Sequence, residues 1–332
     1  GTLIDGTGDA PAANRAILLD DGVITALGDQ AVEQAAPDAT TIDATGKTVM
    51  PGLIDAHLHS TFDDVQSNDQ LFFHRDPTMV ALTTAQNLQK ILRAGVTSFV
   101  DPDTLHGVGP SIRDAIDAGV IEGPRMKTGV QALLTAVGGT AGRLIPDGGT
   151  VGYAQVVHSV DDVILWTRRH VKFGADWIKI HATGSTPTHR GELLVWSADE
   201  LRASCDTAHE LEVPVMAHCR NSESVRVAAQ AGVDLILHAS FMDEVALEAV
   251  IASGAAVCPT FTFLANLADF GASVGATPGM EDVFRNEISA TAKMMREAYD
   301  AGVMLICGSE SGFALTPYGH WHAREMEVFV EE

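Results

Sequence analysis

Residues 49–59 read VMPGLIDAHLH, an apolar and strand-like run that ends in two histidines separated by one residue. Because side chains alternate between the two faces of a strand, His57 and His59 point in the same direction. Two neutral imidazoles that converge on one point suit a divalent transition metal. A bare His-x-His pattern is as compatible with two ordinary polar residues at a strand end. The interpretation therefore depends on whether the rest of the chain supplies further ligands.

A sequence pattern that recurs along the chain predicts the fold class. A helix-like stretch, the tripeptide Ala-Gly-Val and an apolar run follow one another around residues 94–96, 231–233 and 301–303. Glycine just after a helical pattern is a typical helix stop, and the β-branched run after it indicates a strand. Helices that alternate with short apolar strands predict parallel strands joined by crossover helices. We expect eight strands, near 49–59, 96–102, 125–131, 177–183, 213–219, 234–240, 256–263 and 303–309.

Eight βα units predict an α/β fold, a TIM (β/α)8 barrel over residues 48–332. A doubly wound open sheet is the alternative, but it would not usually place polar residues at so many strand ends. No Gly-x-Gly-x-x-Gly motif supports a dinucleotide-binding fold. Residues 1–47 differ, because Asp20-Asp21-Gly22 between two apolar runs is a hairpin signal.

Short strands at 16–19, 23–27 and 40–43 predict a small N-terminal β domain over residues 1–47, which we expect to be partial here. The chain stops inside the helix expected after the eighth strand. Long loops are expected at 138–162 and 264–285.

The composition is that of a globular protein, with 332 residues, of which 46% are hydrophobic and 20% charged. The net charge of −23 argues against nucleic acid or an anionic membrane surface as a partner. No apolar run approaches the roughly 18 residues that cross a bilayer. The four cysteines show no Cys-x-x-Cys spacing. They indicate free thiols in a reducing compartment, so we expect a cytoplasmic protein.

Four further predicted strands end in residues suited to metal chemistry. Lys179 lies between two isoleucines, where an unpaired ammonium group would be costly. Carboxylation by carbon dioxide would turn this amine into a carboxylate that can bridge two metals. A lysine that reaches solvent or pairs with a barrel carboxylate is the alternative, which this strand alone favours. The other three strands end near His218, His238 and Glu310.

The order PGLIDxHxH, Lys, His, His and a final acidic residue resembles the amidohydrolase superfamily. Within it, the sequence is most similar to the imidazolonepropionase-like, prolidase-like branch of metal-dependent hydrolases. The resemblance covers nearly the whole chain and includes the short motifs Gly123-Pro124-Arg125 and Ala182-Thr183-Gly184. It implies a TIM barrel beside a small β-sandwich, with a binuclear metal centre at the barrel.

The resemblance also implies a role for each ligand of that centre. His57 and His59 would bind the buried α metal. Lys179, carboxylated, would bridge the two metals. His218 and His238 would hold the β metal. Zinc is the expected metal, with cobalt, manganese or iron as alternatives.

Three departures from the family pattern concern catalysis and substrate binding. Glu310 stands where the family mostly has the Asp that binds the α metal and acts as base, and its extra methylene moves the carboxylate by about 1.5 Å. Thr140 stands where relatives often have a histidine that contacts substrate. Arg220 and Arg226 stand where peptidase members carry a Tyr and an Arg that hold the substrate carboxylate. An arginine can do this in bidentate fashion, but Arg220 could equally pair with Glu223 on the surface.

The resemblance implies an enzyme, a metal-dependent hydrolase that cleaves an amide-type C–N bond in a small-molecule substrate. The expected substrates are ureas, carbamates, thiocarbamates, anilides or N-acyl amino acids. A prolidase-like dipeptidase or carboxypeptidase is the alternative. A hypothesis of another class is a metal-binding barrel whose catalysis is impaired because of Glu310. Relatives are commonly homo-oligomers, and we expect the same here.

Overall fold

The computed structural model describes residues 1–63, 75–139, 152–188, 190–313 and 315–331. The chain divides into two compact units, Gly1–Gly52 and Leu53–Glu332. The domain boundary expected between residues 47 and 48 stays a prediction, and the division in the structure lies a few residues further along. The single strand expected at 49–59 is wrong. Its start belongs to β4 (Thr48–Val49) of the small unit, and β5 (Leu53–Asp55) begins the larger one.

The small unit contains two short sheets and one helix. β1 (Thr2–Leu3) pairs in parallel with β4. β2 (Ile17–Asp20) and β3 (Val23–Leu27) form the expected antiparallel hairpin, and α1 (Asp29–Gln34) follows it. The strand expected at 40–43 is wrong, because these residues form no regular secondary structure. Ile42 is 87% exposed there, so no packing stabilises an extended pair.

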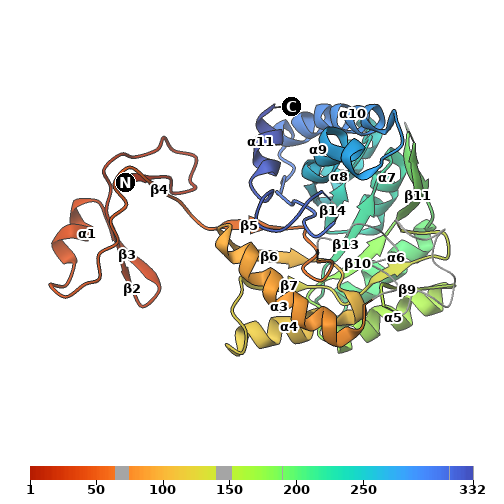
Figure 1. The fold of residues 1–332 in the computed structure, drawn as a ribbon. Helices are drawn as coiled ribbons and strands as arrows, with labels where there is room; N and C mark the ends of the chain where they lie inside the picture. Colours follow the sequence, from red (N-terminus) through yellow and green to blue (C-terminus); the bar gives the residue numbers. More distant parts are fainter. Residues whose placement is uncertain (64–74, 140–151, 189, 314, 332) are drawn as a thin grey trace. The chain divides into compact units, whose positions relative to one another are not determined.

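The larger unit is built on parallel strands, and Figure 1 shows its helices packed around the outside of them. One sheet contains β5, β6 (Val96–Asp101) and β7 (Arg125–Thr128). A second sheet has the order β15 (Ala256–Cys258), β14 (Leu235–His238), β13 (Val215–Cys219), β10 (Ile178–His181), β8 (Ala132–Leu134) and β9 (Ala154–Val156). Every pairing in these two sheets is parallel, as the alternation of helices and strands predicts.

Backbone hydrogen bonds join the edges of the two sheets. The Asp176 N–H donates to the Thr128 carbonyl at 2.8 Å and so connects β10 to β7. On the other side, Leu305 forms a parallel bridge to β15, and the Ala56 N–H donates to the Cys307 carbonyl at 2.9 Å. The strand positions thus follow one another in the circular order of a TIM barrel. At the eighth position only the bridge at Leu305 forms, instead of the full strand expected at 303–309.

Strand alternation separates two hydrophobic clusters. Side chains such as Ile180 and Ile236 face outward and pack against helix residues such as Leu201 and Leu247. The inward-facing side chains instead pack against residues of other strands, and this inner cluster contains Met216, Leu235, Leu237 and Cys258. The inner face is therefore apolar below the strand ends that carry the predicted ligands.

The crossover helices begin and end where the sequence signals indicate. Ser197 caps α6 in a capping box with Glu200, and Gly232 ends α7 in the left-handed conformation. The described residues of the larger unit form the α-helices α3 (Pro77–Arg93), α4 (Gly109–Asp117), α5 (Val160–Lys172), α6 (Ala198–His209), α7 (Ser222–Ala231), α8 (Glu244–Ser253), α9 (Phe261–Phe270), α10 (Met280–Asp300) and α11 (Arg324–Glu331).

The long loop expected at 264–285 is wrong, because α9 and the short helix η2 (Gly271–Val274) occupy much of it. Leu264 and Ala265 of α9 are buried against the core, and this tertiary packing outweighs the loop-like composition that follows. The other expected loop, 138–162, lies partly outside the described residues, and its described part contains β9. None of the helices formed by the described residues combines the length and apolar character that a membrane crossing requires.

The side chain of Asp176 reinforces the junction between β7 and β10. Its Oδ2 accepts hydrogen bonds from Arg113 Nη1 at 2.8 Å and from the Thr128 N–H at 3.1 Å. Its Oδ1 accepts one from Lys127 Nζ at 2.8 Å. Burial raises the pKa of this carboxyl, but the bonds from Lys127 and Arg113 outweigh burial and lower the pKa below its ordinary value.

We expect Asp176→Asn to lower the free energy of unfolding by about 1–2 kcal/mol at neutral pH, allowing for solvent screening. A lowered folded-state pKa gives stability above the unfolded pKa, and this stability is lost as pH falls through the folded value. The difference between wild type and variant in urea denaturation should therefore shrink in acid. Asp199→Asn, at a side chain that is 88% exposed, is the control. A difference that stays constant into acid would contradict this role of Asp176.

Candidate active site

Polar side chains from the carboxyl ends of the barrel strands meet around one buried cavity. This is the end of a TIM barrel at which active sites lie. The cavity is lined by His57, His59, Asp103, Tyr153, Lys179, His181, His218, Glu310 and Phe313. Of the ligands predicted from the sequence, only His238 is not among the lining residues. It lies directly beside the cavity, next to His57 and Glu310.

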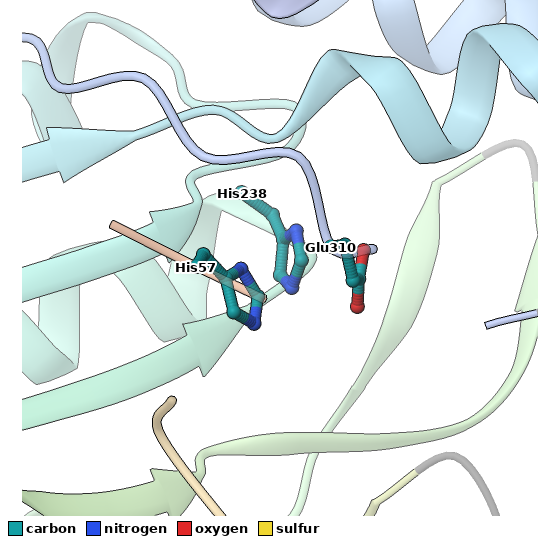
Figure 2. Close-up of side chains that lie close together, drawn as sticks. All are labelled: His57, His238 and Glu310. Atoms are coloured by element: carbon teal, nitrogen blue, oxygen red, sulfur yellow. The ribbon is translucent and has the colours of Figure 1, made fainter. Parts of the chain in front are cut away.

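His57, His238 and Glu310 form a group that could hold a metal ion, because one ligand atom of each lies within 4.8 Å of the others. Figure 2 shows the two imidazole rings side by side, with the carboxylate of Glu310 near them. His57 Nε2, both ring nitrogens of His238 and Glu310 Oε2 are buried without a hydrogen-bond partner in the described part of the chain. Such atoms are costly to bury. Together they make a donor set that fits a divalent cation.

Thr260 orients the ring of His57. Its Oγ1 lies 3.1 Å from His57 Nδ1 and donates its own proton to the Cys258 carbonyl at 3.2 Å. The hydroxyl can therefore accept the Nδ1 proton of His57, which leaves the lone pair on Nε2. Thr260 has a φ of 58°, a conformation that is uncommon for residues other than glycine. The strained turn before α9 thus supports a ligand of the candidate site.

Two of the predicted ligands also have a left-handed backbone conformation. Alternation in β14 would place His238 on the face of Ile236, which packs toward the helices, but a φ of 67° at His238 marks where the chain leaves strand geometry. Glu310 has a φ of 56°, and its N–H donates to the His57 carbonyl at 2.6 Å. Burial raises the pKa of the Glu310 carboxyl to about 7, although Arg220 and Lys179 oppose the shift.

Lys179 is 1% exposed, so its side chain does not reach solvent. Within the described ranges, no carboxylate lies at ion-pair distance from its ammonium group. Burial lowers the pKa of Lys179, while Asp103 and Glu310 oppose this. A lower pKa favours the neutral amine, which is the nucleophilic form of lysine.

Two buried carboxylates that the sequence analysis did not assign face the histidines. Glu192 Oε2 lies 2.8 Å from His218 Nε2, and Asp103 Oδ1 lies 3.4 Å from His59 Nδ1. Burial lowers the pKa of both histidines to about 4, so their rings are neutral at neutral pH. Burial raises the pKa of the Glu192 carboxyl, but the contact with His218, the charge of Arg220 and the hydrogen bond from Thr183 together lower it below its ordinary value.

Strand alternation could have found some of these residues. His181 follows Lys179 by two positions on the same face of β10, and Asp101-x-Asp103 repeats at the end of β6 the spacing of the two histidines. Asp103 Oδ2 lies 3.7 Å from His181 Nε2, so the two side chains are neighbours in the cavity. Glu192 lies in a hairpin outside the barrel strands, and no periodic signal marks it.

The predicted substrate-binding residues are arranged differently from the metal ligands. Arg220 is buried and its Nε donates to Glu287 Oε1 at 3.0 Å, so the surface pairing with Glu223 is wrong. Glu223 instead accepts from Arg226 Nε at 3.0 Å on α7. Neither arginine lines the cavity described above. Thr140 lies outside the described residues.

Gly308 lets the eighth strand position approach the first histidine. A Cβ at this position would lie 2.7 Å from the Cβ of His57 and 2.9 Å from its backbone nitrogen. We expect Gly308→Ala to cost about 1–3 kcal/mol by overpacking and to lower the melting temperature measured by calorimetry. Gly271→Ala is the control, since its nearest neighbour is 3.2 Å away. Equal melting temperatures for the two variants would contradict this packing constraint.

The family model of the amidohydrolase family matches residues 48–325, and the chain belongs to this family. The ochratoxinase of Aspergillus niger is 28% identical over 265 residues, which are 74% of this chain and 54% of that protein. The chain thus spans about half the length of this curated relative.

Two solved structures extend the comparison. An amidohydrolase has a TM-score of 0.82 at 26% identity, over 99% of this chain and 81% of that one. A prolidase in complex with N-methylphosphonate-L-proline has a TM-score of 0.75 at 28% identity, over 93% of this chain and 76% of that one. The family and the fold predicted from the sequence are confirmed. The family generally uses divalent metals, and the cluster of histidines and Glu310 is compatible with one.

Proposed function

We propose that this chain carries the active site of a metal-dependent hydrolase that cleaves an amide-type C–N bond in a small molecule. The observation that carries the proposal is the cluster of His57, His238 and Glu310, where buried ligand atoms converge that have no hydrogen-bond partner among the described residues. Membership of the amidohydrolase family supports the reaction class. The ochratoxinase and the prolidase among the similar proteins support the same class.

The proposed centre holds two divalent cations, with zinc favoured over cobalt, manganese and iron because histidine nitrogens and carboxylates dominate the donor set. His57 and His59 would hold one cation, and His218 and His238 the other. A carboxylated Lys179 would bridge the pair. Its burial and its lowered pKa support this modification, because they favour the neutral amine.

Divalent cations, when bound, lower the pKa of water and polarise a carbonyl group. The residues of the chain then supply proton transfer and an enclosed site. Glu310 takes the proton of the attacking water and returns it to the leaving nitrogen, because its carboxylate lies within 4.8 Å of ligand atoms of His57 and His238. Phe313 and Tyr153 line the cavity beside it and keep the reacting bond away from bulk solvent.

The position of the Glu310 carboxylate bears on the alternative of a barrel that binds metal without turnover. That alternative assumes that the longer side chain misplaces the base. The carboxylate nevertheless lies within 4.8 Å of ligand atoms of His57 and His238. The extra methylene is thus accommodated within the cluster, which favours the catalytic proposal.

The environment of the two arginines bears on the substrate. Arg226 is held by Glu223 and Gln230, and Arg220 donates from Nε to Glu287, whereas Arg220 Nη2 is buried without a partner in the described part of the chain. Neither arginine lines the cavity, which favours neutral ureas, carbamates, thiocarbamates and anilides over dipeptides. The prolidase-like alternative is supported by the similar structure that holds a phosphonate of proline, because a tetrahedral phosphorus resembles the intermediate of amide hydrolysis.

A substrate panel tests the reaction directly. We expect purified protein loaded with zinc, cobalt or manganese to hydrolyse at least one of phenylureas, carbamates, anilides and N-acyl amino acids. Its kcat/KM on these substrates should exceed that on Xaa-Pro dipeptides. Glu310→Gln should lower kcat by roughly 100-fold or more, because it removes the general base. His170→Gln, at a buried histidine of α5 outside the cavity, is the control. No turnover of any substrate at full metal occupancy would support the binding-only alternative.

The bridging role of Lys179 predicts a metal count. Elemental analysis should find about two divalent ions per chain in the wild type. We expect Lys179→Ala to lose one or both, because the bridging carboxylate is gone, whereas Lys172→Ala on α5 should lose neither. Loading in bicarbonate-free buffer should lower the count of the wild type in the same way. A count of one that Lys179→Ala does not change would exclude the bridge.

Two further expectations from the sequence stay predictions. The cytoplasmic location and the homo-oligomeric state are supported by composition and by the resemblance, respectively. Cell fractionation and analytical ultracentrifugation of the purified protein measure them.

A further inference from the structure

A single hydrogen bond determines which nitrogen of His218 can bind a cation. His218 Nε2 lies 2.8 Å from Glu192 Oε2, and both side chains are 3% exposed. A carboxylate only accepts hydrogen bonds, so the proton between the two atoms belongs to Nε2. A neutral imidazole carries one N–H, and the lone pair of His218 is therefore on Nδ1.

The carboxylate of Glu192 is itself fixed from several directions. It projects from the hairpin of β11 (Thr183–Thr188) and β12 (Gly191–Leu194), which follows the strand that carries Lys179. Thr183 Oγ1 donates to Glu192 Oε2 at 2.8 Å. The Glu192 N–H donates to the Arg220 carbonyl at 3.0 Å, and Asn221 Nδ2 donates to the Glu192 carbonyl at 2.6 Å. The hairpin is thus tied to the residues directly after β13, the strand of His218.

This contact requires a glycine in the hairpin. Gly191 has a φ of 84°, and a Cβ at this position would lie 1.7 Å from the Arg220 carbonyl oxygen. Any other residue would push β12 away from the end of β13. The close approach places Glu192 beside His218, although neither the alternation nor the spacing of the barrel strands indicates it.

In His57 it is the other ring nitrogen, Nδ1, that contacts a neighbouring side chain. Its Nδ1 faces Thr260, so its lone pair is on Nε2, the atom that is buried without a partner in the described part of the structure. The two histidines therefore carry their lone pairs on different ring nitrogens. In each histidine, a residue outside the predicted ligand set determines which nitrogen is protonated: Glu192 for His218 and Thr260 for His57.

We propose that Glu192 is a positioning residue that holds His218 in the Nε2–H tautomer and thereby presents Nδ1 to the metal centre. The second part of this inference rests on the proposed function, because it needs a bound cation. The first part is a property of the protein without metal. In metalloproteins, loss of such an outer partner typically lowers metal affinity by about 10–100-fold.

Nitrogen-15 NMR of the histidine rings tests the tautomer in the full chain, before and after removal of metal with a chelator. The His218 signals are assigned by their loss in His218→Gln. We expect Nε2–H in the wild type and in Glu192→Gln, whose amide oxygen can still accept. In Glu192→Ala, the Nδ1–H form should appear. Leu193→Ala, at a 62% exposed neighbour on the same strand, should leave the spectrum unchanged.

Zinc titration provides the second readout. Glu192→Ala should bind one zinc ion at least roughly tenfold more weakly than the wild type, Glu192→Gln should be affected less, and Leu193→Ala should stay within twofold. If Glu192→Ala fails to fold, Thr183→Val replaces it, because this variant removes the hydroxyl that holds the carboxylate. It should then shift the tautomer in the same direction.

The outcomes separate this inference from the proposed function. A wild-type His218 with its proton on Nδ1 would overturn the role of Glu192. An unchanged tautomer and unchanged zinc affinity in Glu192→Ala would do the same while leaving metal-dependent hydrolysis intact. A tautomer that switches in a protein that binds no zinc would instead support the hydrogen-bond role and overturn the metal centre.

Discussion

The buried ligand atoms of the candidate metal site set the main energetic demand that the barrel has to meet. His57 Nε2, the ring nitrogens of His238 and one oxygen of Glu310 are buried, and no hydrogen bond from the described residues satisfies them. Each such atom costs about 1–3 kcal/mol. The apolar inner cluster below the strand ends contributes the packing that keeps the barrel closed despite this cost. A cation bound by these atoms would offset the cost, which links the stability of the fold to the proposed chemistry.

Much of the fold and of the ligand set could be predicted because both follow from local rules. The tripeptide Ala-Gly-Val predicts helix ends, and Gly232 and Gly302 have the left-handed conformation at these ends. Alternation predicts that His57 and Lys179 face inward. The rest depends on contacts between distant residues. Arg220 pairs with Glu287, which lies 67 positions away, and no local pattern could favour it over Glu223.

Several residues that build the candidate site stand where the backbone leaves regular strand geometry. His238, Thr260 and Glu310 all have positive φ, and each directs a side chain to the site from the last residue of a strand position or just after it. Strain of this kind persists only where surrounding structure fixes it. Here the fixing contacts include the Glu310 N–H to the His57 carbonyl and the packing of Gly308 against His57. The site is therefore preorganised by residues at the strand ends, where the regular alternation of side chains breaks down. Glu192 extends this support from outside the barrel strands.

Anomalous X-ray diffraction from crystals of the zinc-loaded chain, recorded at the zinc absorption edge, can locate metal in the buried cavity and show whether Lys179 is modified. We expect anomalous peaks within the cavity, in contact with His57, His238 and Glu310, and electron density for a carboxylate on Lys179 Nζ between them. Zinc bound only outside the cavity, with an unmodified Lys179, would rule out a metal centre bridged by this lysine.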